Sequence, residues 1–356
     1  MAERDDSVRH DIRITTNDWV YALGAVTGVG GTETRMSEAA RTVVRRGGRV
    51  RAVIWSASRD TSIVRMMEDA GVEVHTTQSV LSYLFFLGAS RRAAIFTFGL
   101  RPSLAARLLR FSIRRHGSVL SLRNGLDAGW SAWMHRVDRL SSRWQDGYLV
   151  NSQAVRDHLI KWGAKPDNIF LVEGALSEEW FTPADHIKRS RPVMAMVGND
   201  RPEKNQLFGL KTMLRLEPSS VAIRVYTDNA TRLREAVDQH SSLVIDFIEQ
   251  RRLGPSDFDD IDILVMPSLS ESLPRAILEA RARGCQIVTS NVGSSASMID
   301  TATSSVVDGF EPSEWETAFR RAIERHRVAR RVTSHMIRTT GDYVADIDRI
   351  TRGLTP

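Results

Sequence analysis

The stretch IDILVMPSLSESLPRAILEARARGCQIVTSNVG, residues 261–293, predicts the fold of this chain. Its apolar start at residues 261–266 is typical of a buried strand, and a loop rich in serine and proline follows. Pro274 indicates the start of a helix over residues 275–283, because proline fits the first helical position. A second apolar run at residues 286–290 completes a strand–loop–helix–strand unit, which favours parallel strands joined by crossover helices.

The same alternation of short apolar runs and longer amphipathic stretches extends through most of the chain. It stops at residues 174–191, where mixed charge and few aliphatic side chains indicate a linker, and then starts again. The sequence therefore predicts an α/β protein of two Rossmann-like, doubly wound domains that face each other across a cleft. The expected strands are residues 19–23, 50–55, 72–75, 93–98, 118–122, 147–150, 169–172, 193–197, 221–226, 243–247, 261–266 and 286–290. The expected helices include residues 34–46, 62–69, 103–115, 154–162, 206–214 and 275–283, and most of 312–350.

Length and composition exclude several classes of protein. With 356 residues, 42% of them hydrophobic and 26% charged, the chain has ordinary globular composition, which excludes a disordered protein, a collagen-like repeat and a disulfide scaffold. Cys285 is the only cysteine, so no internal disulfide can form and a reducing compartment fits best. The longest apolar stretch, residues 80–89, is too short to span a bilayer as a helix. Residues 1–11 alternate acids and bases, which predicts no signal segment.

The basic charge is carried almost entirely by arginine. There are 49 basic and 43 acidic residues, a net charge of +6, and only five of the basic residues are lysines. So uniform a preference indicates genomic codon bias, and selection for anionic partners stays as the alternative. No basic tail, aromatic RNA-binding box or zinc-finger spacing is present, so no nucleic-acid partner is expected.

Two glutamates mark the decisive segment as a candidate site. Glu271 lies in the loop after a predicted parallel strand, and Glu279 follows eight residues later in the second turn of the helix. Ser272 and Leu273 form the turn that enters this helix, whose free backbone N–H groups and dipole attract a phosphate. The segment resembles the retaining glycosyltransferases of family 4 (glycosyl transferases group 1), in which a strand leads into PS..E-G-x-P and a second glutamate. That resemblance implies the GT-B fold.

Residues 196–205, MVGNDRPEKN, resemble a second motif of this family, in which an arginine and a lysine hold the donor diphosphate. Lys204 falls on the lysine position, whereas Asn199 replaces the arginine. We expect Arg201 to take the place of that arginine, because Pro202 restricts it to an extended backbone that aims its side chain consistently. Arg123 is the competing source of the second positive charge.

Residues 24–33, GAVTGVGGTE, resemble the G-G-x-E turn of the family, with Gly30 and Gly31 at matching positions. Glycine permits the close backbone approach that a loop touching a pyrophosphate requires. Many members carry a histidine after the middle strand of the first domain, where this chain has Arg123 and Asn124. Either Arg123 contacts the donor sugar or an anion, or this half of the chain follows a divergent subgroup.

The resemblance implies transfer of a sugar from a nucleotide-diphosphate donor to an unknown acceptor, with retention and without an obligatory metal or other cofactor. Glu271 would hold the donor sugar, Glu279 the ribose, and Arg201 and Lys204 the diphosphate. The acceptor could be a glycan, a lipid-linked sugar or a small molecule. A sugar-nucleotide epimerase with the same fold and a non-catalytic nucleotide-sugar binder stay as alternatives.

The resemblance also bears on domains and location. The expected domains are residues 1–180 on the acceptor side and 181–335 on the donor side, with residues 336–356 as a final helix and tail on the first domain. We expect a cytoplasmic protein. Residues 103–115, with four arginines around apolar side chains, are either an anionic-membrane docking helix on the inner membrane face or an ordinary crossover helix.

Two further patterns are interpreted as structural. The aspartates at residues 257–262 precede a strand instead of ending one, so they are not expected to bind metal. Trp130, Trp133 and Trp144 are expected to pack in the core or between domains, with an acceptor platform as the alternative.

Overall fold

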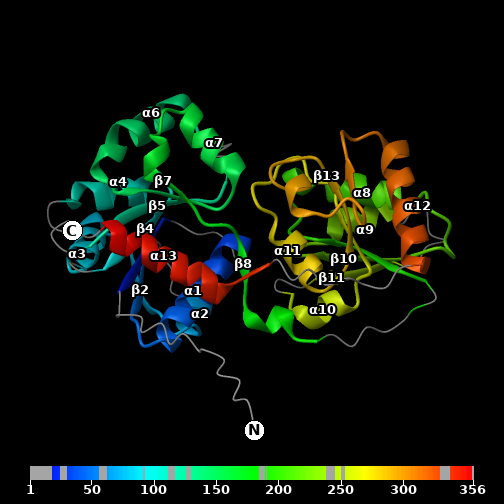
Figure 1. Cartoon of the computed structure of the whole chain (residues 1–356), viewed down its shortest axis with the longest axis horizontal. Coiled ribbons are helices and arrows are strands. Elements are labelled where there is room, and N and C mark those ends of the chain that lie inside the picture. Colours follow the sequence, from blue (N-terminus) through cyan, green and yellow to red (C-terminus); the bar gives the residue numbers. More distant parts are fainter. Residues whose placement is uncertain are drawn as a thin grey trace, which may run out of the picture.

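The computed structural model describes residues 18–24, 30–55, 62–90, 93–110, 117–125, 130–183, 189, 191–237, 245–249, 253–328 and 337–354. Their strands form two larger parallel sheets, each flanked by helices, that lie side by side (Figure 1). The first sheet has seven strands in the order β3-β2-β1-β4-β5-β6-β7. The second has six in the order β11-β10-β9-β12-β13-β14. The predicted α/β class with two doubly wound parallel sheets is confirmed.

The first sheet is built from β1 (Trp19–Leu23), β2 (Val50–Trp55), β3 (Glu73–Thr77), β4 (Ala94–Phe98), β5 (Val119–Arg123), β6 (Gly147–Val150) and β7 (Ile169–Leu171). Its helices are α1 (Gly31–Arg45), α2 (Ser62–Glu68), α3 (Val80–Gly88), α4 (Leu100–Leu108), α6 (Ala132–Ser141) and α7 (Gln153–Lys161), with 3₁₀ turns η1 (Ser142–Trp144) and η2 (Pro166–Asn168). Apolar clusters cover both faces of the sheet, which explains why the central strand β1 is a continuous apolar run, whereas the edge strand β3 is polar and only partly buried.

The second sheet is built from β9 (Val193–Val197), β10 (Ala222–Thr227), β11 (Ile245–Glu249), β12 (Ile263–Met266), β13 (Gln286–Ser290) and β14 (Ser305–Val307). Its helical elements are η4 (Pro202–Lys204), α8 (Gln206–Met213), α9 (Thr231–Val237), α10 (Pro255–Asp259), α11 (Arg275–Ala282), η5 (Ala296–Met298) and α12 (Pro312–Val328). Separate apolar clusters lie on its two faces as well.

The last helix, α13 (Thr340–Leu354), joins the core of the first sheet although it follows the second in sequence. Tyr343, Val344 and Ile347 belong to the same buried cluster as Trp19 and Met36, and α13 packs on α1. A two-stranded parallel pair, β8 (Ala175–Leu176) with β15 (Arg338–Thr339), lies at the two crossings between the halves. The expected linker therefore holds a short strand and the 3₁₀ turn η3 (Glu178–Phe181).

Two sequence-based expectations differ from the structure. The helix expected over residues 103–115 is α4, which ends at Leu108, and residues 111–116 lie outside the described part. Pro274 is the N-cap of α11 and not its first helical residue. Among the described residues, no helix combines the length and apolar character needed to cross a bilayer.

Candidate functional site

A cleft of about 670 Å³ opens between the two halves of the chain. Its walls come from loops at the carboxyl ends of the strands, and they include the segments after β1 and β5 on one side and after β9 and β12 on the other. β1 and β4 are neighbours at the point where the strand order of the first sheet reverses, and β9 and β12 are neighbours at that point of the second. Ligands of open α/β sheets bind at such switch points.

Lys204 and Glu271 meet in this cleft. Lys204 Nζ lies 2.6 Å from Glu271 Oε1, and Ser268 Oγ donates to the same oxygen at 2.9 Å. The two charged residues come from the loops after β9 and β12, which are held together because Leu269 N donates to Glu203 O at 2.8 Å. Two motifs that the sequence singled out separately therefore form one charged group.

Gly293 shapes the loop that carries Glu271. It has φ of +56°, and a Cβ atom there would lie 1.8 Å from the carbonyl oxygen of Glu271. No other residue fits this approach without moving the backbone. Ser294 N also donates to Ser272 O at 3.1 Å, so the loop after β13 braces the one after β12.

Arg201 and Asn199 both line the cleft beside Lys204. Arg201 has the extended backbone expected before Pro202, with φ of −122° and ψ of 147°. Its side chain is 55% exposed and its guanidinium lies 3.9 Å from Glu203, too far for a hydrogen bond. Arg201 is thus a loosely held cation at the cleft wall.

Glu279 also lines the cleft, and it is held by a residue that sequence reasoning missed. Arg275 Nε donates to Glu279 Oε1 at 2.6 Å, and its two terminal nitrogens donate to both carboxylate oxygens of Glu38 at 2.7 and 2.9 Å. Burial disfavours the charged form of Arg275, but Glu279 and Glu38 together raise its pKa above the ordinary value. Glu38 belongs to α1, so this ion pair joins the two halves.

Nothing in the sequence signals that contact. Arg275 and Glu38 are 237 residues apart, and each is an ordinary charged residue of an amphipathic helix. Arg35, one turn before Glu38, also lines the cleft, and burial lowers its pKa.

Gly30 and Gly31 lie at the start of α1 and line the cleft. The amide of Gly30 donates to Glu33 Oε2 at 2.9 Å, so a phosphate there would have to compete with this carboxylate. A Cβ on Gly31 would lie 3.4 Å from Arg275 Cβ, so α1 and α11 approach to about van der Waals contact at this position. Residues 25–29 of the expected glycine loop lie outside the described residues.

Ser272 and Leu273 contact the first half of the chain. Ser272 Oγ donates to the backbone oxygen of Asn124, which follows β5. A Cβ on Gly174 would lie 2.4 Å from Leu273 Cδ2, so Leu273 packs against the segment after β7. Ser272 and Leu273 therefore line the cleft and also connect the two halves of the chain across it.

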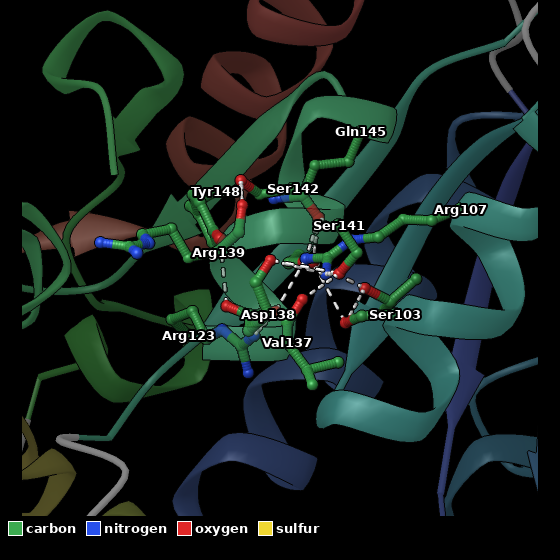
Figure 2. A network of polar contacts seen from close by, with 12 residues as sticks. Ser103, Arg107, Arg123, Val137, Asp138, Arg139, Ser141, Ser142, Gln145 and Tyr148 are labelled. Carbon is green, nitrogen blue, oxygen red and sulfur yellow. Dashed lines mark hydrogen bonds and ion pairs between the residues drawn. The ribbon is translucent and has the colours of Figure 1, made fainter. Parts of the chain in front are cut away.

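Arg123 is not among the residues that line the cleft, although its neighbour Asn124 is. It is 3% exposed, and its Nη2 donates to Asp138 Oδ1 at 2.7 Å. Arg107 Nη2 donates to the same oxygen at 2.9 Å, and Tyr148 OH donates to Asp138 Oδ2 at 3.0 Å (Figure 2). Burial, with the Asp138 charge next in effect, raises the pKa of Tyr148 to about 12. Trp130 covers the group, with its ring centroid 4.4 Å from the Arg123 guanidinium.

This network corrects two expectations. Arg107 is one of the four arginines of residues 103–115 that the membrane-docking alternative places on the surface. It is buried instead, because Asp138 and Gln145 bind its guanidinium inside the first domain. Trp133 and Trp144 are exposed, so core packing is wrong for these two tryptophans.

The aspartates of residues 257–262 have structural partners. Asp257 accepts from the amide of Gly254, Asp259 pairs with Arg283, and Asp262 accepts from Val193 N. Asp260 pairs with Arg189 and Arg224.

Two facing Rossmann-like domains with the cleft between their switch points define the GT-B architecture, and solved structures share it. HepE of Anabaena, in complex with UDP and glucose, superimposes with a TM-score of 0.76 at 14% identity, covering 93% of this chain and 98% of that one. A glycosyltransferase of Rickettsia africae gives a TM-score of 0.74 at 13% identity, covering 96% and 93%. The expected GT-B fold is confirmed.

Sequence comparison gives the family likeness. Residues 191–325 match the family described as glycosyl transferases group 1. The D-inositol 3-phosphate glycosyltransferase of Paenarthrobacter aurescens is 45% identical over 197 residues, 48% of this chain and 47% of that protein. The one of Corynebacterium kroppenstedtii is 29% identical over 202 residues, 49% and 44%. The chain thus spans about half the length of the curated relatives it matches.

Proposed function

We propose that this protein is a retaining, metal-independent glycosyltransferase of family 4 that uses a nucleotide-diphosphate sugar. The observation that carries the proposal is the Lys204–Glu271 contact, 2.6 Å long, at the switch point of the second sheet. It puts a cation for a diphosphate next to a carboxylate for a sugar. The relatives' names, which describe sugar transfer, and the UDP and UDP-glucose bound to HepE support the donor class.

The chemistry requires a diphosphate to leave. The bond between the anomeric carbon and the diphosphate oxygen breaks, and its electron pair goes to that oxygen. The acceptor hydroxyl oxygen bonds to the same face of the carbon, and its proton passes to the departing diphosphate. Positive charge aimed at the leaving group lowers the barrier, which is the role of Lys204 and Arg201.

The Lys204–Glu271 ion pair must open when the donor binds, so the diphosphate engages Lys204 before the sugar engages Glu271. In this structure Lys204 is paired with Glu271, and a diphosphate competes for the ammonium group. Glu271, whose side chain is largely buried, then accepts hydrogen bonds from the donor sugar and favours its cationic transition state. Glu279, held in place by Arg275, accepts from the ribose hydroxyls.

The domain limits belong to the same proposal. Residues 1–180 would hold the acceptor, residues 181–335 the donor, and residues 336–356 would return to the first domain. The protein would act in the cytoplasm.

The experiment measures released nucleotide diphosphate with a panel of nucleotide sugars and acceptors, and nucleotide affinity by calorimetry. Glu271→Ala should abolish transfer and change nucleotide affinity no more than a few-fold, because its contacts are to the sugar. Glu279→Ala should weaken nucleotide binding by about 1–3 kcal/mol, the usual cost of unpaired polar partners. Glu203→Ala removes a half-buried acid beside Lys204 that does not line the cleft, and it is the matched control.

Equal loss of nucleotide binding in both variants, with unchanged turnover of bound donor, would contradict these roles. If an epimerised sugar nucleotide forms without any acceptor, the protein is an epimerase. If nucleotide binds and no donor is turned over, the protein is a non-catalytic binder. Loss of sugar transfer on addition of a metal chelator would contradict metal independence. A product whose anomeric configuration is opposite to that of the donor would contradict retention.

A further inference from the structure

Large apolar side chains gather on one layer of helices in the first domain. α3, α4 and α6 are neighbours there, and Figure 1 shows α4 between the other two. Seven of the eleven large apolar side chains exposed among the described residues lie on these helices and on η1. They are Val80, Leu81, Phe85, Leu108, Trp133, Leu140 and Trp144. Single exposed apolar side chains are ordinary, whereas a gathering of this kind marks a contact surface.

Helix α3 shows the feature most clearly. Its sequence, VLSYLFFLG, contains no charged residue. Tyr83 and Leu87 face the sheet and are buried, while Leu81 and Phe85, one turn apart on the outer face, are 79% and 71% exposed. A helix that is apolar on all sides is typical of one covered on both faces.

The exposed charges of this layer are all positive. α3, α4, α6 and η1 contain one acid, Asp138, and it is buried against Arg107 and Arg123. The exposed charged side chains of these four elements are Arg101, Arg136, Arg139 and Arg143. Residues 74–126 contain eight arginines and no aspartate or glutamate, in a chain whose acids and bases are otherwise nearly balanced. Glu73, just before this stretch, is paired with His75 at 2.9 Å.

We propose that the outer surface of α3, α4, α6 and η1 is a docking surface for an anionic lipid membrane. Exposed leucine, phenylalanine and tryptophan insert at the level of the headgroups, and arginines beside them contact lipid phosphates. Arg143 and Trp144 show this pairing directly, with the guanidinium 4.7 Å from the ring centroid. A second copy of the chain fits this surface less well than a membrane does, because a symmetric dimer contact would bring the same arginines of the two copies against one another.

This surface replaces the one expected from sequence. Arg107 belongs to the buried network around Asp138 and is not on this surface. More of the exposed apolar side chains of the surface come from α3 than from α4. The inference concerns a face away from the cleft residues, so it stands whether or not the proposed sugar transfer is correct.

The test is flotation of the full chain with vesicles of phosphatidylcholine alone or of equal parts phosphatidylcholine and phosphatidylglycerol. We expect binding to the anionic vesicles only, and less of it as salt is raised. Leu81→Ser with Phe85→Ser should reduce the bound fraction about tenfold or more, since two inserted side chains are lost. Arg136→Gln with Arg143→Gln should weaken binding about fivefold for each arginine.

Matched controls separate the surface from general effects. Leu171→Ser removes an exposed leucine from β7, and Arg215→Gln with Arg349→Gln changes the net charge equally at exposed positions outside the layer. These variants should float like the wild type, and all variants should keep its melting temperature. Equal binding to both vesicle types, no binding to either, or equal loss in the control variants would overturn the proposal. A concentration-dependent dimer that Leu81→Ser with Phe85→Ser dissociates would assign the surface to a second copy instead.

Discussion

Lys204 is one of five lysines in a chain that otherwise uses arginine for positive charge. An ammonium group is a compact point charge with three donors, so it can leave a carboxylate for a phosphate without the fixed geometry of a guanidinium. Its partner Glu271 is largely buried, whereas Lys204 itself is partly exposed. The lysine is therefore the mobile member of the pair, and Glu271 the fixed one.

The cation beside Lys204 can be identified by substitution. Arg201 lines the cleft and is loosely held, while Arg123 is buried against Asp138. Arg201→Ala and Lys204→Ala should each raise the dissociation constant of the nucleotide diphosphate on the order of tenfold or more, as expected for a lost charged hydrogen bond. Arg123→Ala should leave that constant within a few-fold. Calorimetric titration of the three variants is the measurement. Normal affinity in the Arg201 variant together with weakened binding in the Arg123 variant would show that Arg123 supplies the second charge.

At the scale of elements, α1 and α11 meet through a buried group of one arginine and two glutamates. Arg275 of α11 is shared between Glu279 on its own helix and Glu38 on α1. A bidentate pair adds geometric specificity to its energy. This contact therefore sets how α1 and α11 lie against each other, and with them the glycine turn and Glu279.

Removing Arg275 leaves two buried carboxylates, Glu38 and Glu279, without their cation. Arg275→Gln should lower the free energy of unfolding by about 3–5 kcal/mol. Glu38→Gln should lower it less, because Glu279 still compensates the charge of Arg275. The double variant should lose less than the sum of the two, because both single variants already lose the same Arg275–Glu38 contact. Urea denaturation of the four proteins completes the double-mutant cycle. Additive losses would mean that Arg275 and Glu38 are not coupled in solution.

At the scale of the whole molecule, the chain crosses between its halves twice. β8 and β15 pair where the crossings meet, and α13 then completes the core of the first sheet. The first sheet is thus not fully covered until the last residues of the chain are in place. We therefore expect the stability of the first half to depend on α13.

This dependence is measurable by hydrogen exchange. Ile347 of α13 is buried in the first core, and Ile347→Ala should destabilise that core by about 2–5 kcal/mol. Amides of β1 and β2 should then exchange faster, while those of β9 and β12 should keep their rates. Arg349→Ala, at an exposed position of the same helix, is the control. Equal acceleration in both sheets would show that the halves unfold as one unit.

Local pattern was enough to predict much of this architecture. The strands β1, β2, β6, β9 and β13 begin and end at the predicted residues, because strands covered on both faces are continuous apolar runs. The Glu271 loop and the Lys204 turn were also visible in the sequence, since each depends on a short motif after a strand. Their meeting in space follows from the strand order, which puts the ends of β9 and β12 side by side.

The positions of long charged side chains were decided only by tertiary structure. Arg107 follows apolar residues on a helix and looks exposed in sequence, yet Asp138 on α6 draws it into the interior. Arg275 and Glu38 resemble surface residues of their own helices, yet they form the ion pair between the halves. The reason is physical: an arginine or glutamate can reach several ångströms in any direction, so its burial depends on the partner across the packing interface. Backbone periodicity is local and is readable in sequence, whereas a charge and its distant partner are brought together only by the fold.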